Sequence, residues 1–102
     1  MLAELSIFPT DKGESVSQYV AEVVGYIKSE CSRKGMAYET NSMATIIEGE
    51  SRDVWELIVG CHNLMGASSN RYYSIIKIDN RKDKVNAIRD KPAKIEELLR
   101  KH

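Results

Sequence analysis

The chain has 102 residues, enough for one domain with one hydrophobic core, and we expect residues 1–102 to form that domain. Its 15 basic and 15 acidic residues give a net charge of zero, which argues against a nucleic-acid-binding or membrane-surface protein. Since the start lacks a basic signal segment and no apolar run approaches the ~20 residues that span a bilayer, we expect a cytoplasmic protein.

Cysteine and histidine are too few and too poorly spaced to predict a metal site. Cys31 and Cys61 fall on apolar helical stripes, where a free cysteine usually packs as a small hydrophobic residue. The two histidines are His62, beside Cys61, and His102 at the chain end, so no metal-ligand spacing is present. The best case for an enzyme would pair Cys61 or His62 with an acid, but adjacent helical residues point about 100° apart and no catalytic motif is present, so we predict no enzyme.

The first predicted element is a strand over residues 2–8. Ala3, Leu5 and Ile7 alternate with polar Glu4 and Ser6, which is the period of a strand with one buried face. Pro9 ends the strand because proline cannot donate to a sheet. The odd residues should therefore face a core, and Glu4 and Ser6 should face outward.

A helix follows, with Ser15 as its predicted N-cap and Gln18 completing a capping box. Gly35 is expected to end it in a left-handed conformation. Its apolar stripe repeats every three or four residues and comprises Val16, Tyr19, Val20, Val23, Val24, Ile27 and Cys31.

Two short strands, 36–41 and 43–48, are predicted next, joined tightly at Asn41-Ser42. Ser51 is the expected N-cap of a second helix that ends near Gly66. Its core stripe comprises Val54, Leu57, Ile58, Cys61, Leu64 and Met65. Trp55, Val59 and His62 lie on a neighbouring face, which indicates either an oligomer contact or a broad core face.

The last elements are a strand over residues 71–79 and a charged helical segment after Arg81 that Pro92 interrupts or restarts, with Asp90 as a cap. The order predicts an α+β fold, a ferredoxin-like βαββαβ sandwich with a four-stranded antiparallel sheet and an added C-terminal helix. In that arrangement both long helices cover one sheet face, and the other face is open to a ligand or a partner.

Four stretches of the sequence resemble the thiamine-binding protein family. They are Glu4-Leu5-Ser6-Ile7-Phe8-Pro9, Tyr19-Val20, Met43-Ala44-Thr45-Ile46-Ile47-Glu48-Gly49, and residues 77–84, which read Lys-Ile-Asp-Asn-Arg-Lys-Asp-Lys. The third is the most specific, although Ala44 stands where the family usually has glycine. An added methyl at that position can fill space that glycine leaves open for a close contact.

The resemblance implies a ferredoxin-like fold, assembly into homodimers or homotetramers, and binding of thiamine or its hydroxymethylpyrimidine part without catalysis. Such a ligand needs a carboxylate, hydroxyl or amide partners, and a flat apolar wall. Glu48 is the first candidate for the acidic partner and Glu4 the second. Thr45, Ser6 and Asn41 are candidates for hydrogen bonds, and Met43 and Phe8 for the wall. Each of these residue types also has an ordinary structural role in strands, turns and cores.

Two other functions are known for domains of the same topology. An RNA-binding module would need aromatic residues on its central strands, and residues 44–48 supply none. An oligomeric regulatory or scaffold domain with no small-molecule ligand is the stronger alternative, because ferredoxin-like domains serve many unrelated functions and only a site distinguishes them.

Overall fold

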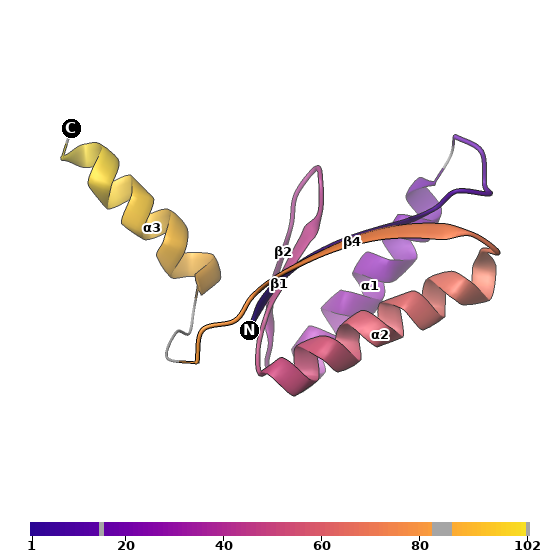
Figure 1. Cartoon of the computed structure of the whole chain (residues 1–102), viewed down its shortest axis with the longest axis horizontal. Helices are drawn as coiled ribbons and strands as arrows, with labels where there is room; N and C mark the ends of the chain where they lie inside the picture. The colour runs from indigo at the N-terminus through magenta and orange to yellow at the C-terminus, as the bar shows by residue number, and fades with distance from the viewer. Residues whose placement is uncertain (15, 83–86, 102) are drawn as a thin grey trace.

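The computed structural model describes residues 1–14, 16–82 and 87–101 and confirms the predicted α+β fold (Figure 1). One antiparallel sheet has the strand order β2-β3-β1-β4. The elements are β1 (Leu2–Pro9), α1 (Ser17–Lys34), β2 (Ala37–Thr40), β3 (Thr45–Glu48), α2 (Ser51–Ser68), β4 (Tyr72–Asp79) and α3 (Ala87–Arg100). Both central strands, β1 and β3, thus come from segments that resemble the family.

The core lies between one face of this sheet and the helices α1 and α2 (Figure 1). Ala3, Leu5 and Ile7 of β1 are buried there, as the two-residue period predicts. The buried apolar residues of the rest of the core are Val23, Ile27, Cys31, Ile47, Val54, Leu57, Ile58, Cys61 and Met65. The even residues of β1 face the opposite side, so Glu4 and Ser6 belong to the open face as expected.

Both helix starts differ from the sequence-based prediction. Val16 occupies the N-cap of α1 without a side-chain hydrogen bond, and Ser15 lies outside the described residues. Ser51 is the first residue of α2 and not its cap, because Glu50 holds the extended cap conformation. α2 also runs on to Ser68, since its backbone hydrogen bonds continue past Gly66. Gly35 ends α1 with φ of 69°, as predicted.

The hairpin strands are shorter than predicted because residues 41–44 form the turn. The Asn41 side-chain oxygen accepts hydrogen bonds from the Met43 amide at 2.8 Å and the Ala44 amide at 3.0 Å. The Asn41 amide in turn donates to the Ala44 carbonyl at 2.9 Å. This side-chain turn takes Met43 and Ala44 out of the strand. β3 therefore has only four residues beside an eight-residue β1.

α3 is continuous from Ala87 to Arg100, with Pro92 inside it, so the predicted interruption is wrong. A proline there removes one backbone hydrogen bond near the helix start, and the remaining turns are unaffected. α3 extends away from the rest of the molecule on the side opposite α1 and α2 (Figure 1). The radius of gyration is accordingly 15.1 Å, compared with about 13 Å for a compact chain of this length.

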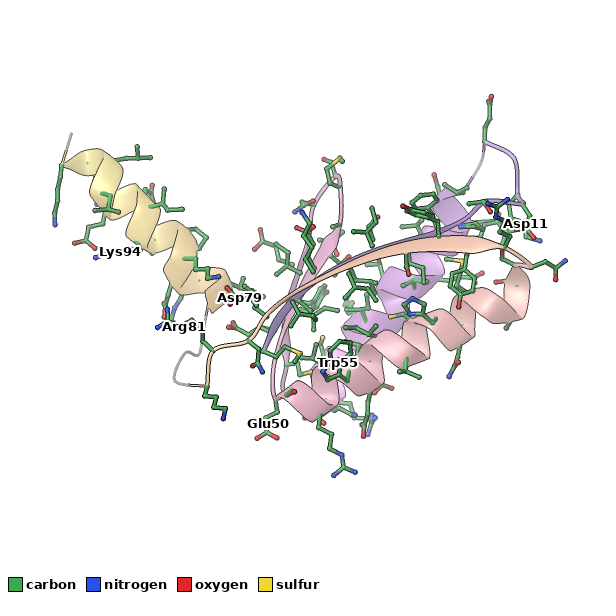
Figure 2. All side chains as sticks on the ribbon, viewed as in Figure 1. Asp11, Glu50, Trp55, Asp79, Arg81 and Lys94 are labelled. Carbon is green, nitrogen blue, oxygen red and sulfur yellow. The ribbon has the colours of Figure 1, made fainter. Side chains whose placement is uncertain are left out.

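No helix in the described ranges is long and apolar enough to cross a membrane. Three large apolar residues of α3, Ile95, Leu98 and Leu99, are nevertheless exposed, by 59%, 46% and 68%. They recur at helical spacing and form one stripe, which we call the α3 stripe. On α2, Trp55 and Val59 are also exposed, so they do not belong to a broad core face (Figure 2).

Candidate functional site

A cavity of about 330 Å³ opens where β1 extends past the start of β3. Its walls are the first half of α1, the second half of β1 and the hairpin turn between β2 and β3. The lining residues are Leu5, Ser6, Ile7, Phe8, Val16, Val20, Val23, Val24, Ile27, Thr40, Asn41, Ser42, Met43, Ala44 and Thr45. The volume is in the range of small-molecule sites in proteins.

The cavity exists because two neighbouring strands differ in length. β1 pairs with β3 from Leu2 opposite Glu48 to Leu5 opposite Thr45, and the turn then carries the chain away. Pairing with β4 continues to Pro9, so β1 remains paired on its other side. Residues 6–9 consequently have a free strand edge toward the hairpin side, and α1 covers this region from the core face.

The lining is apolar on the helix side and polar near the hairpin. Val16, the N-cap of α1, and four aliphatic residues of the helix form the apolar wall; the four are Val20, Val23, Val24 and Ile27. On the opposite side, the hydroxyl oxygens of Thr40 and Thr45 lie 3.0 Å apart and hydrogen-bond each other. None of the described lining residues is ionisable. Such a cavity suits a small, uncharged molecule with a few hydrogen-bonding groups.

Five of the seven residues predicted as ligand contacts line this cavity: Ser6, Phe8, Asn41, Met43 and Thr45. Thr45 faces the core side of the sheet and is only 5% exposed, whereas Met43 at the turn is 83% exposed. Ser6 and Phe8 alternate toward the open face and contribute to the cavity at the free edge of β1. Three distant segments of the chain thus meet at this cavity.

The two predicted acidic partners lie elsewhere, on the open face of the sheet. Glu4 borders a smaller hollow of about 170 Å³ with Ile46 and Lys77, and its carboxylate is 3.8 Å from the Lys77 ammonium. Glu48 accepts a hydrogen bond from the backbone amide of Ile88 at 3.3 Å. A carboxylate suits that position because the first amides of a helix lack partners and carry partial positive charge. Glu48 therefore holds the start of α3.

Reasoning from sequence placed the valines of α1 in the core and missed their contribution to the cavity. Val16, Val20 and Val24 are only half-buried, and they lie on the side of the stripe nearest the end of β1. The mismatch between a long first strand and a short hairpin is the signal that could have revealed the cavity. Ala44 also lines it, at the place where the family usually has glycine.

His62 has hydrogen-bond partners that join α2 to β4. Its Nδ1 is 2.8 Å from the Ile58 carbonyl, which can only accept, so Nδ1 carries a proton. In the neutral ring, Nε2 then accepts from the Ser74 hydroxyl at 2.9 Å. The ring also packs edge-on against Tyr72. Neither the Ile58 carbonyl nor the Ser74 hydroxyl is an acid, so these contacts do not supply the pairing that a catalytic role for His62 would need.

The two cysteines are buried free thiols, 1% and 0% exposed. Burial raises the pKa of Cys61 to about 12 and also raises the pKa of Cys31. We expect the folded protein to resist a thiol reagent at pH 8 and to react at both cysteines in guanidinium chloride, because the thiolate is the reactive form. Rapid labelling of the native protein would contradict this burial.

The same raised pKa values predict a pH dependence of stability. In the unfolded chain both thiols ionise near pH 8.5, whereas in the folded protein they stay protonated, so the free energy of unfolding should fall as the pH rises above about 8.5.

Comparison with known proteins connects this geometry to a family. The model of the family described as thiamine-binding protein matches residues 3–96. UPF0045 protein MJ1052 from Methanocaldococcus jannaschii is 37% identical over 98 residues, covering 96% of this chain and 94% of its own. A UPF0045 protein from Methanothermobacter thermautotrophicus is 34% identical over 100 residues, which cover 95% of this chain and 97% of the relative.

Solved structures agree with this fold. The crystal structure of MJ1052 superimposes with a TM-score of 0.82 at 36% identity, covering 94% of this chain and 95% of that one. A Thermotoga maritima protein named for a suggested role in thiamine biosynthesis or salvage, TM0486, gives a TM-score of 0.78 at 18% identity, with coverage of 92% and 96%. At that identity the second likeness concerns the fold alone. The family match and the similarity to MJ1052 both extend over nearly the whole chain, which therefore belongs to the thiamine-binding protein family.

Proposed function

We propose that this protein binds thiamine or its hydroxymethylpyrimidine part in the cavity beside β1, without catalysing a reaction, and that it does so in the cytoplasm as a homo-oligomer. The observation that carries the proposal is the meeting of five predicted contact residues around one cavity of about 330 Å³. Membership of the thiamine-binding protein family supports the choice of ligand.

The chemistry of the lining favours the pyrimidine ring as the part that enters. Val20 and Val24 offer an apolar wall, and Thr40, Thr45 and Asn41 bring hydroxyl and amide groups. A thiazolium cation would find no carboxylate among the described lining residues, so in thiamine we place that ring at the cavity mouth. A regulatory or scaffold domain with no ligand is the alternative.

Titration calorimetry with thiamine, hydroxymethylpyrimidine and thiamine phosphates tests the proposal. Val20→Phe should weaken binding at least tenfold, because the larger ring occupies the cavity that the ligand needs. Ala21→Phe is the matched control, since Ala21 is the next residue of α1 but is exposed and outside the lining. If none of these compounds binds at millimolar concentration by heat or by thermal shift, the scaffold alternative replaces this proposal.

Glu48→Gln tests whether Glu48 contacts the ligand, as predicted from sequence, or stabilises the start of α3, as its hydrogen bond to Ile88 favours. The carboxylate lies outside the cavity and holds the start of α3, so we expect ligand affinity to change less than about threefold. The protein should instead lose some stability, about 0.3–1 kcal/mol, through the weaker interaction with the helix start. Calorimetry and thermal unfolding of the same sample measure both. A large loss of affinity would restore Glu48 as a ligand contact.

Self-association is supported by apolar surface that this chain leaves uncovered. The α3 stripe is exposed on a helix that extends away from the domain body (Figure 1), and Tyr73, Ile75, Ile76 and Ile78 of the edge strand β4 are 38–54% exposed. Four basic and three acidic residues are interspersed along α3, which suits contact with a second neutral copy better than contact with an anionic membrane. Polar contacts anchor α3 at its base, where the Ile88 amide donates to Glu48 and Lys91 pairs with Asp79. Figure 2 shows Asp79 beside the start of the helix.

A further inference from the structure

The direction of the backbone groups along β1 can be read from its two ends. Met1 and Gly49 exchange hydrogen bonds, with the Met1 nitrogen donating to the Gly49 carbonyl at 2.8 Å and the Gly49 amide to the Met1 carbonyl at 3.2 Å. At the other end, the Thr10 amide donates to the Arg71 carbonyl at 2.8 Å. Backbone groups alternate along an antiparallel strand. Odd residues of β1 therefore present them toward β3, and even residues toward β4.

Ile7 is the odd residue that follows the last pairing with β3, Leu5 opposite Thr45. Its N–H and C=O consequently point toward the hairpin side, where the cavity replaces the missing strand, and Ile7 lines that cavity. Within the described ranges no hydrogen bond is made by either group. Ile7 is only 6% exposed, so solvent has little access to its N–H and C=O groups. Buried backbone groups are almost always paired, and a ligand can supply the partner.

We propose that the free edge at Ile7 reads the 4-amino and ring N3 edge of an aminopyrimidine. The Ile7 N–H donates to ring N3, and the amino group donates to the Ile7 carbonyl. The ring thus makes the two hydrogen bonds that β3 would make if it continued past Thr45. This deepens the proposed function and rests on it: the recognised class is a 4-aminopyrimidine with that edge free, which thiamine and hydroxymethylpyrimidine share. α1 and the turn at residues 41–44 bound the cavity, which favours a small ring over an added peptide strand.

Apolar contacts bind the ring, and the hydrogen bonds to the Ile7 backbone determine which ring is bound. Val20 and Val24 lie on the α1 side of the cavity and offer no hydrogen-bonding side-chain atoms. An analogue of the same shape would thus keep its apolar contacts and differ only at the edge. Replacing the 4-amino group by an oxo group does this, because ring N3 then carries a proton and the exocyclic oxygen accepts. The analogue would place donor against donor and acceptor against acceptor at Ile7.

The test compares hydroxymethylpyrimidine with its 4-oxo analogue by calorimetry on the full chain and follows the Ile7 amide by NMR. The oxo compound should bind 10- to 1000-fold more weakly, since both backbone groups would be left mispaired. The aminopyrimidine should shift the Ile7 amide proton downfield and slow its exchange with solvent. Equal affinity for the two compounds, or an unmoved Ile7 amide, would overturn the edge assignment while the proposed function stood. Failure of both hydroxymethylpyrimidine and thiamine to bind would overturn the two proposals together.

Discussion

Leu98→Glu combined with Leu99→Glu is expected to convert the protein to a monomer. Both leucines belong to the α3 stripe, and the described part of their own chain leaves them 46% and 68% exposed. If a second copy buries them, two adjacent carboxylates would have to lose their hydration at the contact, which is far more costly than leaving the leucines in water. Analytical ultracentrifugation over a hundredfold range of concentration measures the change in mass.

Ala93→Glu combined with Arg100→Gln is the matched control. It changes the net charge by the same amount on the same helix, but both positions lie about half a turn away from the α3 stripe. Wild-type assembly should survive in this control. A wild-type protein that sediments as a monomer would refute the homo-oligomer outright, and an unchanged mass for the Leu98 and Leu99 variant would place the contact on another surface, such as the β4 edge.

The fold could be predicted because its signals are local. Alternation along β1, the stripes of α1 and α2 and the left-handed Gly35 each follow from a few neighbouring residues. The errors fall at element ends, where the deciding contacts are harder to see in sequence. Glu50 and Val16 hold the cap conformations of their helices without any side-chain hydrogen bond, so a search for capping side chains selects the wrong residues.

The site could be predicted only in part, for a physical reason. Sequence alternation shows which face of a strand a side chain occupies, and this correctly placed Glu4 and Ser6 on the open face. It does not show where a neighbouring strand ends, and that ending is what creates the cavity. Glu48 was placed correctly on a central strand, but its contact with Ile88, forty residues later, depends on where the start of α3 lies beside the sheet.

Ile47→Ala should be among the most destabilising single changes in the domain. Ile47 is fully buried on the core face of β3, and its removal leaves a cavity between the sheet and the two helices. Truncations of this kind cost about 2–5 kcal/mol, a large part of the roughly 5–15 kcal/mol that stabilises a typical domain. The melting temperature should fall by about 10–30 °C.

Ile46→Ala is the control for this experiment, because it removes the same atoms one residue earlier on the opposite face of β3. Ile46 lies opposite Glu4 on the open face and is only partly buried, so its loss should cost about 1–2 kcal/mol, less than that of Ile47. Both changes are best measured by urea unfolding in the Leu98→Glu, Leu99→Glu background, because association would otherwise add a concentration-dependent contribution to stability. Equal losses at the two positions would mean that the open face is as well packed as the core, contrary to the strand register described above.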